Sequence, residues 1–99
     1  MTFELGFVRD ALKEWRALDS VTREQFKKKL AERLENPRVP SAKLSGHKDR
    51  YKIKLRAVGY RLVYEVRDAT VTVVVVAVGR RERDAVYRAA AVRSVDDDV

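Results

Sequence analysis

The chain has 99 residues, and its 22 lysines and arginines outnumber its 15 aspartates and glutamates, which gives a formal net charge of +7. The lack of cysteine excludes a disulfide framework and a thiolate metal site, and a hydrophobic share of 45% excludes a disordered composition. A balance this basic indicates a polyanionic partner, and nucleic acid is the commonest of these.

Nothing near the amino terminus has the pattern of an export signal. The first twenty residues carry charges throughout and lack the apolar run of a signal peptide. No apolar stretch is long enough to cross a bilayer. We therefore expect a single cytoplasmic domain over residues 1–99, with a short flexible acidic tail at residues 96–98.

The first third of the chain predicts a strand followed by two helices. Residues 2–7 place apolar side chains alternately on one face, which is typical of a short strand, and the apolar spacing then becomes helical. Asp19 is suited to cap a second helix, and Thr22 with Gln25 also fits a capping box. Pro37 ends this helix, so the two helices are expected to form a hairpin.

Three strands and a helix are predicted after a connector at residues 37–46 that contains both prolines. The strand from Tyr51 and its successor flank Val58-Gly59, a turn signal because glycine accepts a positive φ. The third strand, residues 70–78, is rich in valine and apolar on both faces, which indicates a central strand covered on both sides. A last helix is expected at residues 82–93.

This order of elements predicts the α+β class. The fold would have an N-terminal strand, a helical hairpin, a three-stranded antiparallel meander and a C-terminal helix. We expect the helices to pack on one face of a largely antiparallel sheet, which leaves the other face to a ligand.

The strand that begins at Tyr51 gathers positive charge on one face. Alternation places Lys52, Lys54 and Arg56 on the side opposite Tyr51 and its apolar neighbours. Like charges this close repel one another and add nothing to the stability of a sheet. The row therefore indicates a bound anion.

The next strand is expected to add a fourth cation to this face. With an even-numbered loop, Arg56 lies opposite Arg61 and Lys54 lies opposite Val63. Residues opposite one another in an antiparallel pair share a face, so Arg61 joins the row.

Several segments together resemble the RelE family of bacterial toxins. They are ALKEWRAL, REQFKKKLAERLENPR, KLSG, YKIKLRAVGYRLVYEV and VAVGRRERDAVY, and the similarity runs from about Phe3 to Arg93. This family belongs to the wider RelE/ParE superfamily. The resemblance implies an endoribonuclease that cleaves mRNA in the ribosomal A site and is inhibited by a cognate RelB-like antitoxin. Neither a metal nor a small-molecule cofactor is expected.

The residues agree with such chemistry. RNA is cut without a metal when its own 2′-hydroxyl attacks the adjacent phosphorus, which requires a base, charge stabilisation and protonation of the leaving oxygen. The only histidine, His47, lies in a loop-like segment and is expected to be an exposed loop residue. Lys54 is then the best candidate for the base, because flanking cations lower a lysine pKa. Lys52 and Arg61 are suited to hold the scissile phosphate.

The resemblance assigns roles to two further residues. Arg81, just past the valine-rich strand, matches a residue that acts on the leaving group, where its guanidinium is suited to stabilise charge because it rarely loses a proton. Tyr87 matches an aromatic residue that stacks on a base, a contact worth about 1–3 kcal/mol. The remaining cations are expected to bind ribosomal RNA through its phosphates: Arg56, Lys43, Lys48 and Arg83.

Other interpretations of these residues remain open. Lys52, Lys54 and Arg56 can belong to an ordinary solvated strand face. Arg80, Arg81 and Arg83 can form only a charged loop, and spacing alone favours a core position for Tyr87. Glu65, expected opposite Lys52, either pairs with it or weakens RNA binding. Two other functions remain open as well: a ParE-like toxin of the same fold that acts on DNA gyrase, and an RNA-binding module without turnover.

Overall fold

The computed structural model describes residues 2–47, 49–82 and 84–95. The elements follow in the predicted order: strand β1 (Glu4–Phe7), helix α1 (Arg9–Ala17), helix α2 (Ser20–Glu35), a short 3-10 helix η1 (Pro40–Ala42), strands β2 (Arg50–Leu55), β3 (Tyr60–Arg67) and β4 (Thr72–Arg80), and helix α3 (Ala85–Ala91). The predicted α+β class is confirmed. No helix of the described residues is long and apolar enough to cross a membrane.

The strands of the described residues form one sheet in the order β1-β4-β3-β2. Strands β2, β3 and β4 are antiparallel neighbours, so the predicted meander is confirmed, while β1 runs parallel to β4 and makes the sheet mixed. The valine-rich strand β4 lies between β1 and β3, and Val73 to Val78 are all buried. Its expected central position is therefore correct, and both of its faces are covered.

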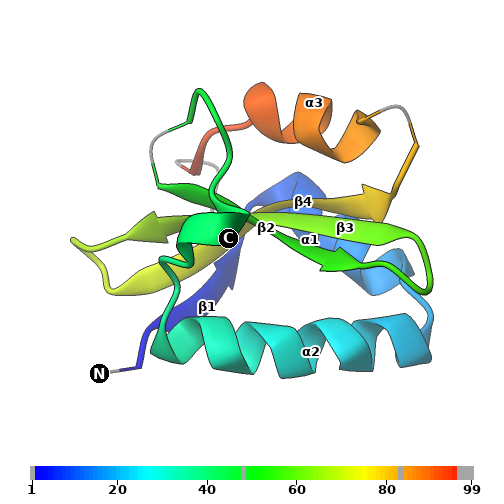
Figure 1. Cartoon of the computed structure of the whole chain (residues 1–99), viewed down its shortest axis with the longest axis horizontal. Coiled ribbons are helices and arrows are strands. Elements are labelled where there is room, and N and C mark those ends of the chain that lie inside the picture. The colour runs from blue at the N-terminus through cyan, green and yellow to red at the C-terminus, as the bar shows by residue number, and fades with distance from the viewer. Residues whose placement is uncertain (1, 48, 83, 96–99) are drawn as a thin grey trace.

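Helices cover both faces of the sheet, so the prediction that they pack on one face is wrong. Figure 1 shows α2 along one side of the sheet and α3 on the other. Helix α3 packs against β3 and β4 through the buried Val86 and Ala90. The physical reason is that the cationic face also carries apolar residues such as Val63, which is fully buried and needs a cover.

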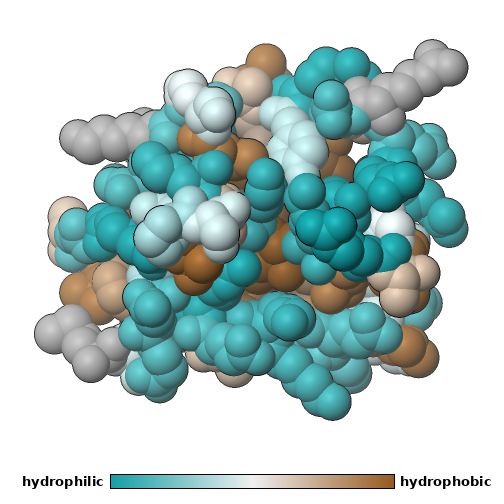
Figure 2. All heavy atoms as spheres, viewed as in Figure 1, coloured by the Kyte–Doolittle hydropathy of each residue, from teal (hydrophilic) through white to brown (hydrophobic). Residues whose placement is uncertain are grey.

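The core on the α2 side is built around aromatic side chains. Trp15 of α1 lies between Phe7 and Phe26, with ring centroids 5.3 Å and 6.3 Å apart, and the rings of Tyr51 and Tyr64 stack at 5.7 Å. The outer surface of α2 is hydrophilic, and hydrophobic atoms show between it and the sheet (Figure 2). The predicted helical hairpin of α1 and α2 is confirmed.

Helix α2 begins at its predicted cap. The Asp19 carboxylate accepts a hydrogen bond from the Thr22 backbone N–H at 3.1 Å, which satisfies one free amide of the first turn. The alternative capping box that starts at Thr22 is wrong, because Thr22 already lies inside the helix and is buried.

Two turns set the ends of the strands. Gly59 has a φ of +70° and its N–H donates to the Leu55 carbonyl at 2.9 Å, which closes the turn between β2 and β3. Val71 has a φ of +51°, a left-handed conformation that does not continue a strand. Strand β4 therefore begins at Thr72 rather than at residue 70.

The buried hydroxyl of Tyr64 ties the connector to the sheet. It donates to the Pro37 carbonyl at 2.6 Å and accepts from the Arg33 guanidinium at 2.8 Å. We expect Tyr64→Phe to lower the free energy of unfolding by about 1–3 kcal/mol, because it removes two hydrogen bonds, one to the Pro37 carbonyl and one from the Arg33 guanidinium. Urea denaturation followed by circular dichroism measures this change.

The matched control is Tyr60→Phe. The hydroxyl of Tyr60 has no hydrogen bond among the described residues, so its removal should change stability by less than about 0.5 kcal/mol. Equal effects of the two substitutions on the free energy of unfolding would show that the hydrogen bonds of the Tyr64 hydroxyl do not stabilise the fold.

Candidate active site

Lys52 and Lys54 lie on the face of β2 that carries Arg50, whose side chain binds carbonyls at the end of α3. The register pairs Lys54 with Arg61 and Lys52 with Val63. The predicted pairing of Lys54 with Val63 is wrong by two residues, because the turn closes on Leu55 and leaves Arg56 outside the strand. The shift is even, so every side chain keeps its predicted face and Lys54 gains Arg61 as its direct neighbour.

Arg61 is held tightly within the sheet. Its side chain is only 5% exposed, and one guanidinium nitrogen donates to the Tyr60 carbonyl at 3.0 Å. Gly79 of β4 lies directly opposite. A Cβ at Gly79 would lie 3.3 Å from Val86 of α3, so glycine allows the close approach of α3 beside Arg61.

Arg81 reaches the same end of the sheet from a distant part of the sequence. It follows β4 directly, and its backbone N–H donates to the Gly59 carbonyl at 2.7 Å. This bond fastens the residue to the turn between β2 and β3. The side chain of Arg81 is exposed.

Four neighbouring cations act on the amine of Lys54. The charge of Lys52 is the largest cause that lowers the Lys54 pKa, followed by desolvation and then by Arg56, Arg61 and Arg81. The predicted effect of flanking cations is therefore confirmed. A lowered pKa increases the fraction of neutral amine near neutral pH, and only the neutral amine accepts a proton.

Tyr87 of α3 lies beside these arginines. It lines a small pocket with Arg61, Arg81 and the start of α3, and it is half-buried against the core. The core position predicted from spacing is thus only partly correct, because Tyr87 packs against the core and also lines this pocket.

Within the described part of the chain, no acidic side chain neutralises the cations of this cluster. Among residues 2–47, 49–82 and 84–95, no ion pair involves Lys52, Lys54, Arg61 or Arg81. A concentrated positive charge with a depressed lysine pKa is suited to bind a phosphodiester and to remove a proton from a neighbouring hydroxyl.

The other predicted cations are distributed differently. Arg56 is exposed in the turn and close enough to Lys54 to lower its pKa. Lys43 is not part of this cluster: its amine contacts the His47 carbonyl at 3.2 Å and the Tyr51 ring at 5.4 Å, near the start of β2. The predictions for Lys48, Arg83 and the acidic tail lie outside the described residues.

Glu65 does not pair with Lys52 as predicted. The register places it opposite Arg50, and its carboxylate accepts from the Arg50 Nε at 2.8 Å. The correction follows from the same two-residue shift of the hairpin. No role was predicted for Arg50, although its position two residues before Lys52 indicates that it shares the cationic face.

Arg33 of α2 is a second cation that the sequence analysis did not bring to the sheet. Its guanidinium donates to the Lys52 carbonyl at 3.1 Å. It lines an open pocket of about 280 Å³ at the β2 edge together with Lys52, Lys54 and Arg56. Its helical spacing gave no indication of this, because the contact depends on how α2 crosses β2.

His47 lies away from the cationic cluster. It is half-buried and lines a different pocket, together with Arg50 and Glu65. The described residues contain no group of three histidine, aspartate or glutamate side chains that is arranged to hold a metal ion.

Known toxins resemble this chain over most of its length. The family model described as "ParE toxin of type II toxin-antitoxin system, parDE" matches residues 6–85. The mRNA interferase toxin RelE of Escherichia coli strain K12 is 57% identical over 93 residues, which are 94% of this chain and 98% of that protein. A putative RelE-like toxin protein of Escherichia coli is 55% identical over the same shares of the two chains.

Solved structures show the same fold. A double arginine mutant of the E. coli toxin RelE in the free state has a TM-score of 0.85 at 55% identity, over 92% of this chain and 96% of that one. The same mutant bound to an antitoxin RelBc peptide has a TM-score of 0.79 over 94% and 97% of the two chains. With a relative this similar over nearly its whole length, the chain belongs to the RelE family of toxins.

Proposed function

We propose that this protein is the toxin of a type II toxin–antitoxin pair, and that it is an mRNA interferase that cleaves mRNA in the ribosomal A site. The observation that carries the proposal is the gathering of Lys52, Arg56, Arg61 and Arg81 near the amine of Lys54, whose pKa they lower. The mRNA interferase name of a 57% identical relative supports it. Such a protein would act in the cytoplasm, where ribosomes are.

The proposed reaction begins at the ribose. The neutral amine of Lys54 takes the proton of the 2′-hydroxyl, and the 2′-oxygen attacks the adjacent phosphorus. The bond from phosphorus to the 5′-oxygen breaks, which yields a 2′,3′-cyclic phosphate and a 5′-oxygen that takes its proton from water. The hydroxide that remains takes up the proton of Lys54, which restores the neutral amine. No metal or cofactor enters this sequence of steps.

The arginines stabilise the charge that develops during the reaction. Arg61, buried and directly opposite Lys54, would hold the phosphoryl oxygens together with Lys52. Arg81 would stabilise the negative charge on the leaving oxygen. Tyr87 would stack on a base and so fix the nucleotide between these groups.

The surrounding cations would bind the ribosome. Arg56 is exposed beside the cluster and is suited to a phosphate of ribosomal RNA. Lys43, Lys48 and Arg83 keep the same proposed role. Such contacts add affinity and depend strongly on salt, because each one releases counterions.

A RelB-like antitoxin is the proposed protein partner. The solved structures that this chain resembles include the intact E. coli RelBE toxin–antitoxin complex, at 58% identity and a TM-score of 0.78 over 82% of this chain and 99% of that one. Production of the chain together with such an antitoxin should therefore suppress its effect on translation.

Programmed ribosomes provide the direct test. We expect the purified protein to cut mRNA within the reading frame on ribosomes with an empty A site, with cleavage products mapped by primer extension. The rival function, suggested by the ParE name of the matching family model, is tested in parallel by gyrase supercoiling. Inhibition of supercoiling without any mRNA cleavage would contradict the proposal and favour the ParE-like toxin.

A further inference from the structure

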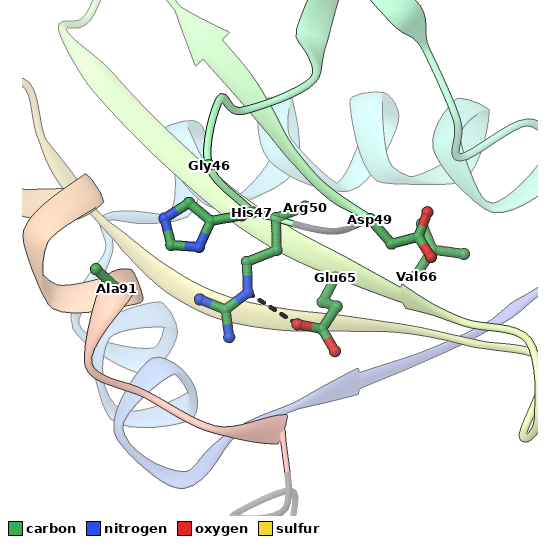
Figure 3. Close-up of a pocket in the computed structure, with 7 residues that line it drawn as sticks. All are labelled: Gly46, His47, Asp49, Arg50, Glu65, Val66 and Ala91. Atoms are coloured by element: carbon green, nitrogen blue, oxygen red, sulfur yellow. Dashed lines mark hydrogen bonds and ion pairs between the residues drawn. The ribbon is translucent and has the colours of Figure 1, made fainter.

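Arg50 is a buried cation that the proposed reaction does not use. It is the first residue of β2 and is only 8% exposed. Figure 3 shows its side chain between Glu65 and the helix that carries Ala91, at one wall of a pocket of about 370 Å³. A charge this buried requires partners, and those partners show what it does.

All three guanidinium nitrogens of Arg50 are engaged. Nε donates to the Glu65 carboxylate at 2.8 Å, which orients the group. The other two nitrogens donate to the carbonyls of Ala90, at 2.5 Å, and Arg93, at 2.8 Å. The Ala90 carbonyl also accepts the Arg93 backbone N–H at 3.1 Å. The C-terminal end of a helix carries partial negative charge and favours a nearby cation, so Arg50 binds the C-terminal end of α3.

Helix α3 depends on such contacts for its position. It has seven residues, too few to be stable without packing. Asp84 at its N-terminal end makes no side-chain cap hydrogen bond. Its C-terminal end is held from two sides, by Arg50 from β2 and by Arg93, which binds the Val76 carbonyl of β4 at 2.9 Å.

Tyr87 connects this helix to the proposed active site. It lies one turn before Ala90 and lines the pocket of Arg61 and Arg81. Without Arg50 the helix end would remain attached to β4 but not to β2. A tilt of the helix would then move Tyr87 relative to Arg61, and small displacements of this kind cost large factors in rate.

We propose that Arg50 is a positioning residue of the nuclease: held by Glu65, it fixes α3 across the sheet and thereby places Tyr87 beside Arg61 and Arg81. This inference rests on the function proposed above for Tyr87. Arg50 itself touches no reacting atom. It acts through the backbone of α3.

The test combines Arg50→Met with Tyr87→Ala in a double-mutant cycle. Methionine keeps an apolar stem and removes every donor. At saturating ribosomes we expect Arg50→Met to lower the single-turnover cleavage rate by on the order of 10- to 100-fold, with little change in the ribosome concentration for half-maximal rate. In the Tyr87→Ala background the same substitution should have little further effect.

Hydrogen exchange measures the position of α3 directly. Amides of residues 86–93 should exchange faster in Arg50→Met, whereas amides of β3 and β4 should not change. The matched control is Arg38→Met, which removes an exposed arginine that pairs with Asp49 and Asp68 and does not contact α3. It should leave both rate and exchange as in the wild type.

Each outcome decides the proposal. If the wild type is active and Arg50→Met is equally active, the proposed role of Arg50 is overturned while the proposed function stands. The same holds if the effects of Arg50→Met and Tyr87→Ala on the rate multiply in the double mutant. An inactive wild type overturns the proposed function and this role with it. If Arg50→Met fails to fold, Arg50→Lys, which keeps the charge and can reach one carbonyl, should lose part of the rate in the wild type and none in Tyr87→Ala. Equal losses in both backgrounds would overturn the proposal.

Discussion

Replacing Lys54 with methionine should lower the single-turnover rate of mRNA cleavage by about 10²- to 10⁴-fold, which is the usual contribution of a positioned general base. The side chain is half-buried on β2, and methionine keeps its unbranched stem. The fold should therefore persist, and binding to the ribosome should change little. Cleavage on programmed ribosomes and pelleting with ribosomes measure the two effects separately.

The pH dependence of the rate gives a sharper test of the same residue. A base acts in its neutral form, so the rate should rise with pH and level off above the pKa of Lys54. Because neighbouring charges lower this pKa, the plateau should begin below the ordinary lysine range. Lys52→Met removes the charge that lowers the Lys54 pKa most. The substitution should therefore raise the Lys54 pKa and move the inflection of the rate profile to higher pH.

The profile is measured with wild type and Lys52→Met across the pH range in which the ribosomes remain intact. A rate that falls with rising pH would show that the protonated amine acts, and Lys54 would then not be the base. If Lys52→Met does not shift the inflection of the pH–rate profile, that inflection belongs to a group other than Lys54. Arg16→Met, an exposed change on α1, serves as the control and should leave the profile unchanged.

Local pattern was sufficient for most of the fold. The alternation from Tyr51 and the run of valines in β4 are properties of neighbouring residues. Both strands were predicted, although β4 is displaced by two residues, to Thr72–Arg80. The parallel pairing of β1 with β4 was not predicted, because it joins Phe7 to Val75 across the two helices and much of the sheet. Pairings this distant in sequence leave no periodic signal.

The register of the hairpin illustrates a different limit. Alternation along a strand fixes which face of the sheet each side chain lies on, so Lys54 and Arg61 were correctly placed on one face. The choice between two registers of equal parity depends on which residue closes the turn. The bond from Gly59 to Leu55 decides it, and turn composition alone does not distinguish this closure from one at Arg56.

Some residues of the candidate site were also predictable from local pattern, and others were not. Lys52, Lys54 and Arg61 follow from strand alternation, whereas roles for Arg81 and Tyr87 came from the family resemblance. Arg50 and Arg33 were missed for two reasons. Glu65, the acidic partner of Arg50, was predicted opposite Lys52, and both arginines also bind backbone carbonyls distant in sequence. Every residue has a backbone carbonyl, so the residue types in a sequence do not indicate such a contact.

Arg81→Ala should lower the cleavage rate by about 10²- to 10³-fold, the usual loss when one group that stabilises transition-state charge is removed. Its side chain is exposed, and its backbone N–H holds the Gly59 carbonyl whatever the side chain is. Stability should therefore change by less than about 0.5 kcal/mol. Ribosome binding should also remain largely intact.

Arg81→Lys separates charge from geometry. Lysine keeps the positive charge but lacks the planar fork of a guanidinium, so a role in stabilising the leaving oxygen predicts partial activity, between alanine and the wild type. Single-turnover cleavage and ribosome pelleting at matched salt compare the three proteins. Equal cleavage by wild type and Arg81→Ala would remove Arg81 from the mechanism. Lost cleavage with an equal loss of binding would instead make Arg81 a ribosome contact, since a phosphate contact changes affinity and leaves the rate of the bound complex unchanged.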